Sequence, residues 1–185
     1  MAFLSCPRMS RLPILLACLL LSLLVASCGD DDDESAATPE PAATATAEAA
    51  GEVDASAISK DLAEKPKVAK PAGTPPAELV KQDVVKGKGP AAKPGDVVSM
   101  QYAGWSWSTG TEFDSSWSRN REPFQFQLGA QMVIPGWDQG IAGMKNGGRR
   151  LLVNPPDLAY GEQGSPPAIG PSETLIFVVD LEKIG

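Results

Sequence analysis

The chemistry of this chain centres on an apolar, aromatic stretch at residues 132–141. Met132-Val133-Ile134 is followed by a Pro-Gly bend and then by Trp137, Ile141 and Met144 at positions i, i+4 and i+7, the spacing of apolar residues on one face of a helix. A helix beginning just after the bend would turn Trp137 inward from its first turn. An indole there can form the floor of a binding pocket or simply fill a core, and the rest of the sequence must distinguish these two roles.

The chain lacks the side chains that most catalytic mechanisms require. It contains no histidine, so Ser-His-Asp catalysis, Cys-His catalysis and histidine-bound zinc or iron are excluded. No glycine-rich phosphate loop precedes a helix, because Gly147 and Gly148 follow the predicted one. Glu112 and Asp114 could be considered as a glycosidase acid pair. However, alternation along an extended segment predicts that Asp114 points to the opposite face from Phe113, with no second carboxylate to pair with it.

Charge argues against a nucleic-acid partner. The formal net charge is -7, and the excess of acid lies before residue 76: residues 28–75 hold eleven acids and four lysines, whereas residues 76–185 hold twelve acids and ten basic residues. No basic surface of the kind that binds nucleic acid is indicated.

Alternation and turn signals predict the elements that must position Trp137. Val98, Met100 and Tyr102 alternate with Ser99 and Gln101, the pattern of a half-buried strand. Strands are predicted at residues 78–86, 97–105, 113–116, 124–128, 149–153 and 174–184, with a hairpin connection at 105–110, one short helix at 137–144 and a long loop at 155–171. This order predicts an α+β domain in which a curved antiparallel β-sheet of about five strands is wrapped around one short α-helix.

An aromatic pocket inside such a sheet suits one reaction that needs neither a nucleophile nor a proton transfer, rotation about an X-Pro peptide bond. Amide resonance gives this rotation a barrier of about 18–20 kcal/mol. The twisted amide has lost that resonance and much of its charge separation, so a dry pocket that fits it better than either planar isomer lowers the barrier. No cofactor is expected. The aromatic residues expected on the inner face are Tyr102, Phe113, Phe124, Phe126, Trp137, Tyr160 and Phe177.

Six short motifs, in order along residues 76–185, together resemble the FKBP-type peptidyl-prolyl isomerases. Each motif alone is weak, but six in register are specific. The motifs are Tyr102-Ala103-Gly104, Phe113-Asp114-Ser115-Ser116, Val133-Ile134-Pro135-Gly136-Trp137, Gly147-Gly148-Arg149-Arg150, Leu158-Ala159-Tyr160-Gly161 and Thr174-Leu175-Ile176-Phe177.

The resemblance implies a role for each site residue. Trp137 would be the floor beneath the proline ring, the Ile134 amide and the Tyr160 hydroxyl would bind substrate or macrolide carbonyls, and Asp114 would belong to a polar edge, acting through Tyr102 or Arg119. The implied site residues are Tyr102, Phe113, Asp114, Phe124, Val133, Ile134, Trp137, Tyr160 and Phe177. The implied partners are proline-containing exported polypeptides and possible macrolide ligands such as tacrolimus and rapamycin.

The sequence departs from the family pattern at several points. Met132 replaces a polar residue before Val133, Ser165 and Ala168 differ in the loop over the pocket, and one additional residue lies between Asn120 and Pro123. These departures bear on macrolide affinity and on sequence preference around proline.

The N-terminus predicts export and lipid anchoring. Arg8 and Arg11 precede and open an apolar run that ends at residue 25, the pattern of a secretory signal. Val25-Ala26-Ser27-Cys28 resembles the bacterial lipobox, which implies a signal peptide at 1–27 and a lipidated Cys28. The mature chain would then hold one cysteine and no internal disulfide. We expect an extracytoplasmic protein anchored to the bacterial cell membrane.

Composition divides the remaining chain into a tether and a domain. Residues 28–75 are rich in Ala, Pro, Thr and acids, with few large apolar residues, and such a segment is expected to be disordered. The resemblance implies that residues 76–185 form the isomerase domain. A second hypothesis stays open at this stage, because a binding or chaperone module with little turnover could use the same aromatic pocket to hold proline-containing segments.

Overall fold

The computed structural model describes residues 51–185. The signal peptide expected at 1–27, the lipidation of Cys28 and the tether residues before position 51 therefore lie outside the described residues. Within the described range, no helix is long and apolar enough to cross a membrane.

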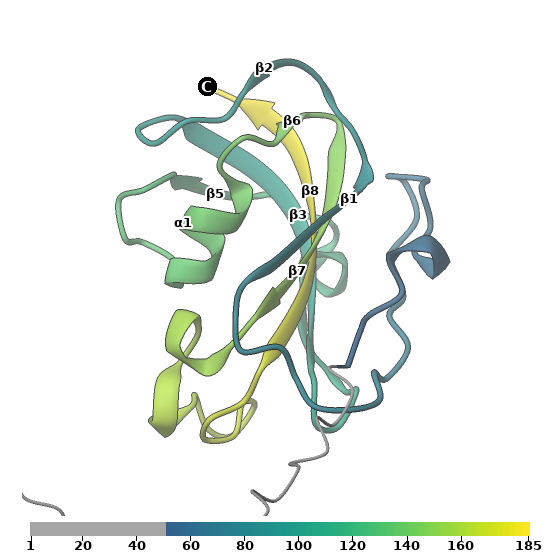
Figure 1. The fold of residues 1–185 in the computed structure, drawn as a ribbon. Helices are drawn as coiled ribbons and strands as arrows, with labels where there is room; N and C mark the ends of the chain where they lie inside the picture. Colours follow the sequence, from purple (N-terminus) through teal and green to yellow (C-terminus); the bar gives the residue numbers. More distant parts are fainter. Residues whose placement is uncertain (1–50) are drawn as a thin grey trace, which may run out of the picture. The chain divides into compact units, whose positions relative to one another are not determined.

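A six-stranded antiparallel sheet organises the described chain (Figure 1). Its strand order is β1-β7-β8-β3-β4, with β5 also pairing with β3, and it is not closed into a barrel. Strands β2 and β6 form a second, two-stranded sheet. The strands are β1 (Val80–Val85), β2 (Lys88–Ala91), β3 (Val97–Ser106), β4 (Glu112–Ser115), β5 (Phe124–Gln127), β6 (Lys145–Asn146), β7 (Gly148–Asn154) and β8 (Leu175–Ile184).

One α-helix, α1 (Pro135–Ile141), lies against one face of the sheet in the described chain (Figure 1). The predicted arrangement of a sheet around one short helix is confirmed, but the predicted helix bounds of 137–144 are wrong. Pro135 opens the helix, because its fixed φ suits the first turn. The helix ends early because Ala142 adopts an extended conformation and Gly143 has a φ of +84°. Short 3-10 helices fill the connections: η1 (Ala55–Ala57), η2 (Ser116–Arg119), η3 (Pro156–Leu158) and η4 (Gly161–Gln163).

The two faces of the sheet carry separate hydrophobic cores. The inner core, on the side of α1, includes Met100, Tyr102, Trp137, Phe177 and Val179. The outer core includes aromatic and branched side chains from the opposite face of the same strands: Ala103, Trp105, Trp107, Leu151, Val153, Ile176 and Val178. Because β3 is covered on both sides, the half-buried pattern expected for 97–105 fails at Gln101, which is only 2% exposed.

Residues 51–75, which we call the strap, cover the outer core. Val53, Ala55 and Ile58 are buried against Trp105 and its neighbours, and Figure 1 shows this segment on the side of the sheet away from α1. The disorder expected for residues 28–75 is therefore wrong for residues 51–75. These three small or branched side chains can be buried because the sheet offers an apolar surface to receive them.

Candidate active site

One pocket brings together all nine residues that the sequence singled out. It is lined by Tyr102, Phe113, Asp114, Phe124, Met132, Val133, Ile134, Trp137, Tyr160 and Phe177 and has a volume of about 180 Å³. An apolar cavity of about 150 Å³ holds a benzene molecule, so this pocket has room for the five-membered ring of proline. Met132 is the one lining residue that the predicted set lacked.

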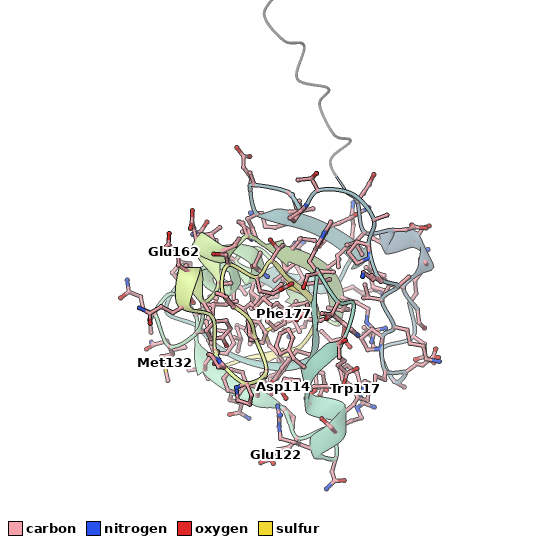
Figure 2. The ribbon with its side chains drawn as sticks, turned by 90° about the horizontal axis from the view of Figure 1, so that it is seen from below. Asp114, Trp117, Glu122, Met132, Glu162 and Phe177 are labelled. Carbon is pink, nitrogen blue, oxygen red and sulfur yellow. The ribbon has the colours of Figure 1, made fainter. Side chains whose placement is uncertain are left out.

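Aromatic rings in edge-to-face contact form the floor and walls. Trp137 is 5% exposed, and its ring centroid lies 5.2 Å from those of both Tyr102 and Phe177, at interplanar angles of 77° and 83°. Phe124 lies 6.1 Å from Trp137 and is 39% exposed at the rim. Such contacts favour fixed ring orientations. In Figure 2, Phe177 lies among the clustered side chains near the centre and Met132 lies at the periphery.

Gly104 makes room for two of these rings. It pairs with Phe177 across β3 and β8, and a Cβ added at Gly104 would lie 2.7 Å from the Phe113 ring and 2.8 Å from the Phe177 ring. The Phe113 and Phe177 rings meet at a centroid distance of 5.6 Å and an angle of 89°. A glycine in this strand therefore allows a close approach that any side chain would prevent.

Phe113 and Asp114 both line the pocket, although strand alternation predicted opposite faces. Gly104 pairs with Asp114 and Trp105 pairs with Glu112, so Phe113 is the extra residue of a β-bulge. A bulge changes the direction of side chains on its strand, and the prediction of opposite faces is wrong for this reason.

Asp114 forms a polar edge with Tyr102 and Arg119. The Tyr102 hydroxyl donates to Asp114 Oδ2 at 2.5 Å, while Arg119 donates from Nη1 to Asp114 Oδ1 and from Nη2 to the Tyr102 oxygen. The Ser115 N–H also donates to Asp114, at 2.7 Å. Asp114 is thus hydrogen-bonded to Tyr102 and Arg119, the two residues through which the resemblance implied that it would act.

The pKa values of this edge keep Asp114 ionised and Tyr102 neutral. Partial burial acts to raise the pKa of Asp114, but the hydrogen bonds from Tyr102, Arg119 and Ser115 outweigh it and hold that pKa below its ordinary value. Burial, together with the bond to Asp114, raises the pKa of Tyr102 to about 12. Neither group is therefore suited to exchange a proton near neutral pH.

Besides the buried Trp137 Nε1, the Ile134 N–H and the Tyr160 hydroxyl at the pocket have no hydrogen-bonded partner within residues 51–185. Ile134 is the residue just before α1, and its backbone is extended (φ -59°, ψ 146°), which leaves its N–H without an acceptor. The Tyr160 hydroxyl is carried by a 44% exposed side chain. Burial, followed by the Asp114 charge, raises the pKa of Tyr160, so this hydroxyl keeps its proton at neutral pH. Both donors can serve carbonyl oxygens of a bound peptide.

The family comparison agrees with this geometry. Residues 89–182 match the family described as FKBP-type peptidyl-prolyl cis-trans isomerase. The chain belongs to this family. It is 56% identical over 122 residues to the FK506-binding protein of Streptomyces anulatus, covering 65% of this chain and 98% of the relative. It is 52% identical over 93 residues to human peptidyl-prolyl cis-trans isomerase FKBP2, covering 50% of this chain and 64% of the relative.

Solved structures of FKBP proteins share the fold. The crystal structure of AtFKBP13 has a TM-score of 0.55 at 36% identity and covers 60% of this chain and 95% of its own. That of FkpA from Escherichia coli has a TM-score of 0.52 at 45% identity, covering 57% of this chain and 47% of its own. The chain is thus an FKBP-type peptidyl-prolyl cis-trans isomerase, and the enzyme class predicted from its sequence is confirmed.

Sequence reasoning missed two features of this FKBP-type pocket. Met132 is 65% exposed and lines the rim; its apolar character beside Val133 was visible in the sequence. Arg119 was named only as a possible partner of Asp114, yet it bonds both Asp114 and Tyr102. Its position five residues after Asp114 became informative only once η2 turned the chain back toward the pocket.

Proposed function

We propose that this aromatic pocket is the isomerase site and that it accelerates X-Pro rotation by holding the twisted amide. The observation that carries the proposal is the convergence of nine predicted residues, from β3, β4, β5, β8, α1 and the loops before α1 and η4, on one pocket floored by Trp137. The proline ring would lie on the Trp137 indole, between the walls formed by Tyr102, Phe124 and Phe177.

Polar groups at the rim would fix the substrate on either side of the rotating bond. The Ile134 N–H and the Tyr160 hydroxyl would donate to substrate carbonyls. The edge formed by Tyr102, Asp114 and Arg119 would supply fixed dipoles near the amide whose charge separation falls on twisting. Every 1.36 kcal/mol by which the pocket prefers the twisted amide over the planar isomers contributes a factor of about ten in rate.

Replacing Trp137 tests the site. In a protease-free isomerisation assay on a proline tetrapeptide, Trp137→Leu should lose most of kcat/KM per folded molecule, because the flat floor is gone. Leu181→Ala is the matched control, since Leu181 is fully buried in the same core but does not line the pocket. Equal activity losses in the two variants would contradict the proposed floor. Peptide binding without turnover by the wild type would favour the holding module instead.

The pocket is also proposed to bind macrolides such as tacrolimus and rapamycin. The name of the Streptomyces anulatus relative, FK506-binding protein, supports this proposal, as does the apolar rim formed by Phe124, Met132 and Tyr160. Competitive inhibition by FK506, weakened in Trp137→Leu, is the expected result. Inhibition that does not compete with the peptide substrate would argue against binding in this pocket.

The clients are proposed to be exported polypeptides that wait on proline isomers, with the enzyme anchored through a lipidated Cys28. Support comes from Arg8, Arg11, the apolar run that follows and the lipobox-like Val25-Ala26-Ser27-Cys28. In a bacterial host, globomycin should shift the mobility of the protein, and Cys28→Ser should abolish both the shift and membrane association. Unchanged mobility with globomycin would contradict the anchor.

A further inference from the structure

The strap, residues 51–75, lies outside the residues that match the family, 89–182. Its two ends meet, because the Gly51 N–H donates to the Thr74 carbonyl at 2.7 Å. Because Val53, Ala55 and Ile58 are also buried, the strap is a packed part of the fold and not a loose tail. Besides the outer core, the strap contacts residues 112–121, the segment that carries Asp114 and Arg119 of the polar edge.

The strap is fixed to the sheet by the fully buried Arg149. This guanidinium pairs with Asp180 at 2.6 Å and donates to the carbonyls of Ser59 and Glu64 at 2.6 and 3.0 Å. Strap residues 59–64 are therefore bonded to β7, the strand that carries Arg149. Because hydrogen bonds from a charged guanidinium are strong, side chains in this part of the strap have a fixed position relative to the sheet.

The same part of the strap contacts the segment 112–121 at both of its ends. At one end, Lys65 forms an ion pair with Glu112 at 2.7 Å. At the other end, the Arg121 guanidinium donates to the carbonyls of Leu62 and Ala63 at 3.3 and 3.4 Å. Asp114 and Arg119 lie between these two contacts, and neither Lys65 nor Glu112 lines the pocket.

The far end of this segment needs such support. Asn120 and Arg121 both have a φ of 57°, a left-handed conformation that side chains rarely adopt and that persists only when the surroundings enforce it. The Arg121 side chain contacts the strap, and its guanidinium stacks over the Trp117 ring at 5.6 Å. The backbone carbonyl of Arg121 accepts a hydrogen bond from Gln101 Nε2 at 2.9 Å. Arg119, two residues earlier, is exposed, and it bonds Asp114 and Tyr102 from the last position of η2, the 3-10 helix that ends at this turn.

We propose that the strap positions the polar edge of the isomerase site, with Lys65 and Arg121 as the positioning residues. The proposal rests on the proposed role of Asp114 and Arg119 in the site. Lys65 fixes the start of β4 and Arg121 fixes the turn after η2. The geometry of Asp114 against Tyr102 is thus set in part by a segment that precedes the matched family region.

Charge reversal tests the proposal in the full chain. Lys65→Glu and Glu112→Lys should each lower kcat/KM on a proline tetrapeptide by about two- to five-fold, the range expected for a partly exposed ion pair, and mainly through kcat. The double variant, which restores opposite charges, should return kcat/KM to within about a factor of two of wild type. Asp83→Asn is the matched control, because it removes another partly exposed ion pair, Asp83 with Arg150, away from the pocket; its kcat/KM should not change.

A merely structural role gives a different result. The single variants would then lower the melting temperature while leaving kcat/KM per folded molecule unchanged, which would overturn the proposal; failure of the double variant to recover would do the same. Asp114→Asn, measured in the same assay, distinguishes failure of the proposed polar edge from failure of the positioning role alone. If it does not lower kcat/KM, the proposed polar edge fails and the positioning role fails with it; if it does and the Lys65 and Glu112 variants do not, only the positioning role fails.

Discussion

The Tyr102 hydroxyl donates a 2.5 Å hydrogen bond to the Asp114 carboxylate, and this bond joins the aromatic wall of the pocket to its polar edge. Tyr102 is held in turn by Trp137, whose ring lies edge-on at 5.2 Å. The position of the carboxylate is therefore coupled to the floor of the pocket, and both ends of the bond have pKa values that depend on it.

Tyr102→Phe should remove a contribution to stability that the wild type loses at alkaline pH. Burial and the bond to Asp114 raise the pKa of Tyr102 to about 12 in the folded state, against about 10 when unfolded. The contribution is therefore complete below about pH 10 and is lost as the pH rises toward 12. Urea unfolding from pH 8 to 12 should show the wild-type advantage over Tyr102→Phe shrinking above pH 10. A constant difference would contradict the assignment.

Asp114→Asn should act at the opposite end of the pH scale. Since the hydrogen bonds from Tyr102, Arg119 and Ser115 outweigh burial and lower the folded pKa of Asp114, its contribution is present above the unfolded value of about 3.9 and is lost as the pH falls through the lower folded value. The wild-type advantage in unfolding free energy should accordingly diminish in acid below about pH 4. An advantage that grows in acid would show that the carboxylate is destabilising.

Gly104→Ala should disturb the pocket from inside the sheet. The new Cβ would lie within 3 Å of the Phe113 and Phe177 rings, and overpacking of this kind costs about 1–3 kcal/mol. We expect lower stability and a raised KM, because the displaced rings narrow the proline site. Gly170→Ala is the control, since a Cβ there meets no atom within 4 Å; equal effects of the two changes would contradict the steric explanation.

The sequence predicts the inner face of this protein better than its outer face. Alternation and ordered motifs led to all nine pocket residues. Tyr102, Phe124 and Phe177 lie on strands, where the local pattern fixes the direction of a side chain. The pocket residues in loops were indicated by the motifs alone. The bulge at Phe113 could not be predicted, since it depends on the pairing of β4 with β3. The strap was missed because Val53, Ala55 and Ile58 stand among prolines and acids typical of disorder. Trp105 and Trp107 could have indicated the strap. They alternate onto the face opposite Tyr102, and two large apolar side chains on that face require other residues to bury them.

Ile58→Ala tests whether the strap belongs to the folded domain. Ile58 is 3% exposed in the outer core, so removing its side chain should cost about 2–5 kcal/mol. Val97→Ala, at a site that is 47% exposed, is the control and should cost less than about 0.5 kcal/mol. Chemical denaturation of both variants makes the comparison. No loss of stability in Ile58→Ala would return residues 51–75 to the class of disordered tether.

Arg149→Met should be among the most destabilising single changes, because it leaves Asp180 and two strap carbonyls without their buried donor. Removing one partner of a buried ion pair costs about 3–5 kcal/mol.

Burial already raises the pKa of Asp180 despite the nearby Arg149, and without Arg149 the carboxyl should favour the protonated form still more. A group whose folded pKa is raised binds its proton more tightly in the folded state, so the deficit of Arg149→Met should shrink as the pH is lowered. Arg149→Met with Asp180→Leu, which removes both charges, should recover part of the loss at neutral pH. Denaturation at pH 5 and 7 checks both results, and a deficit that grows in acid would show that Asp180 is not the group left uncompensated.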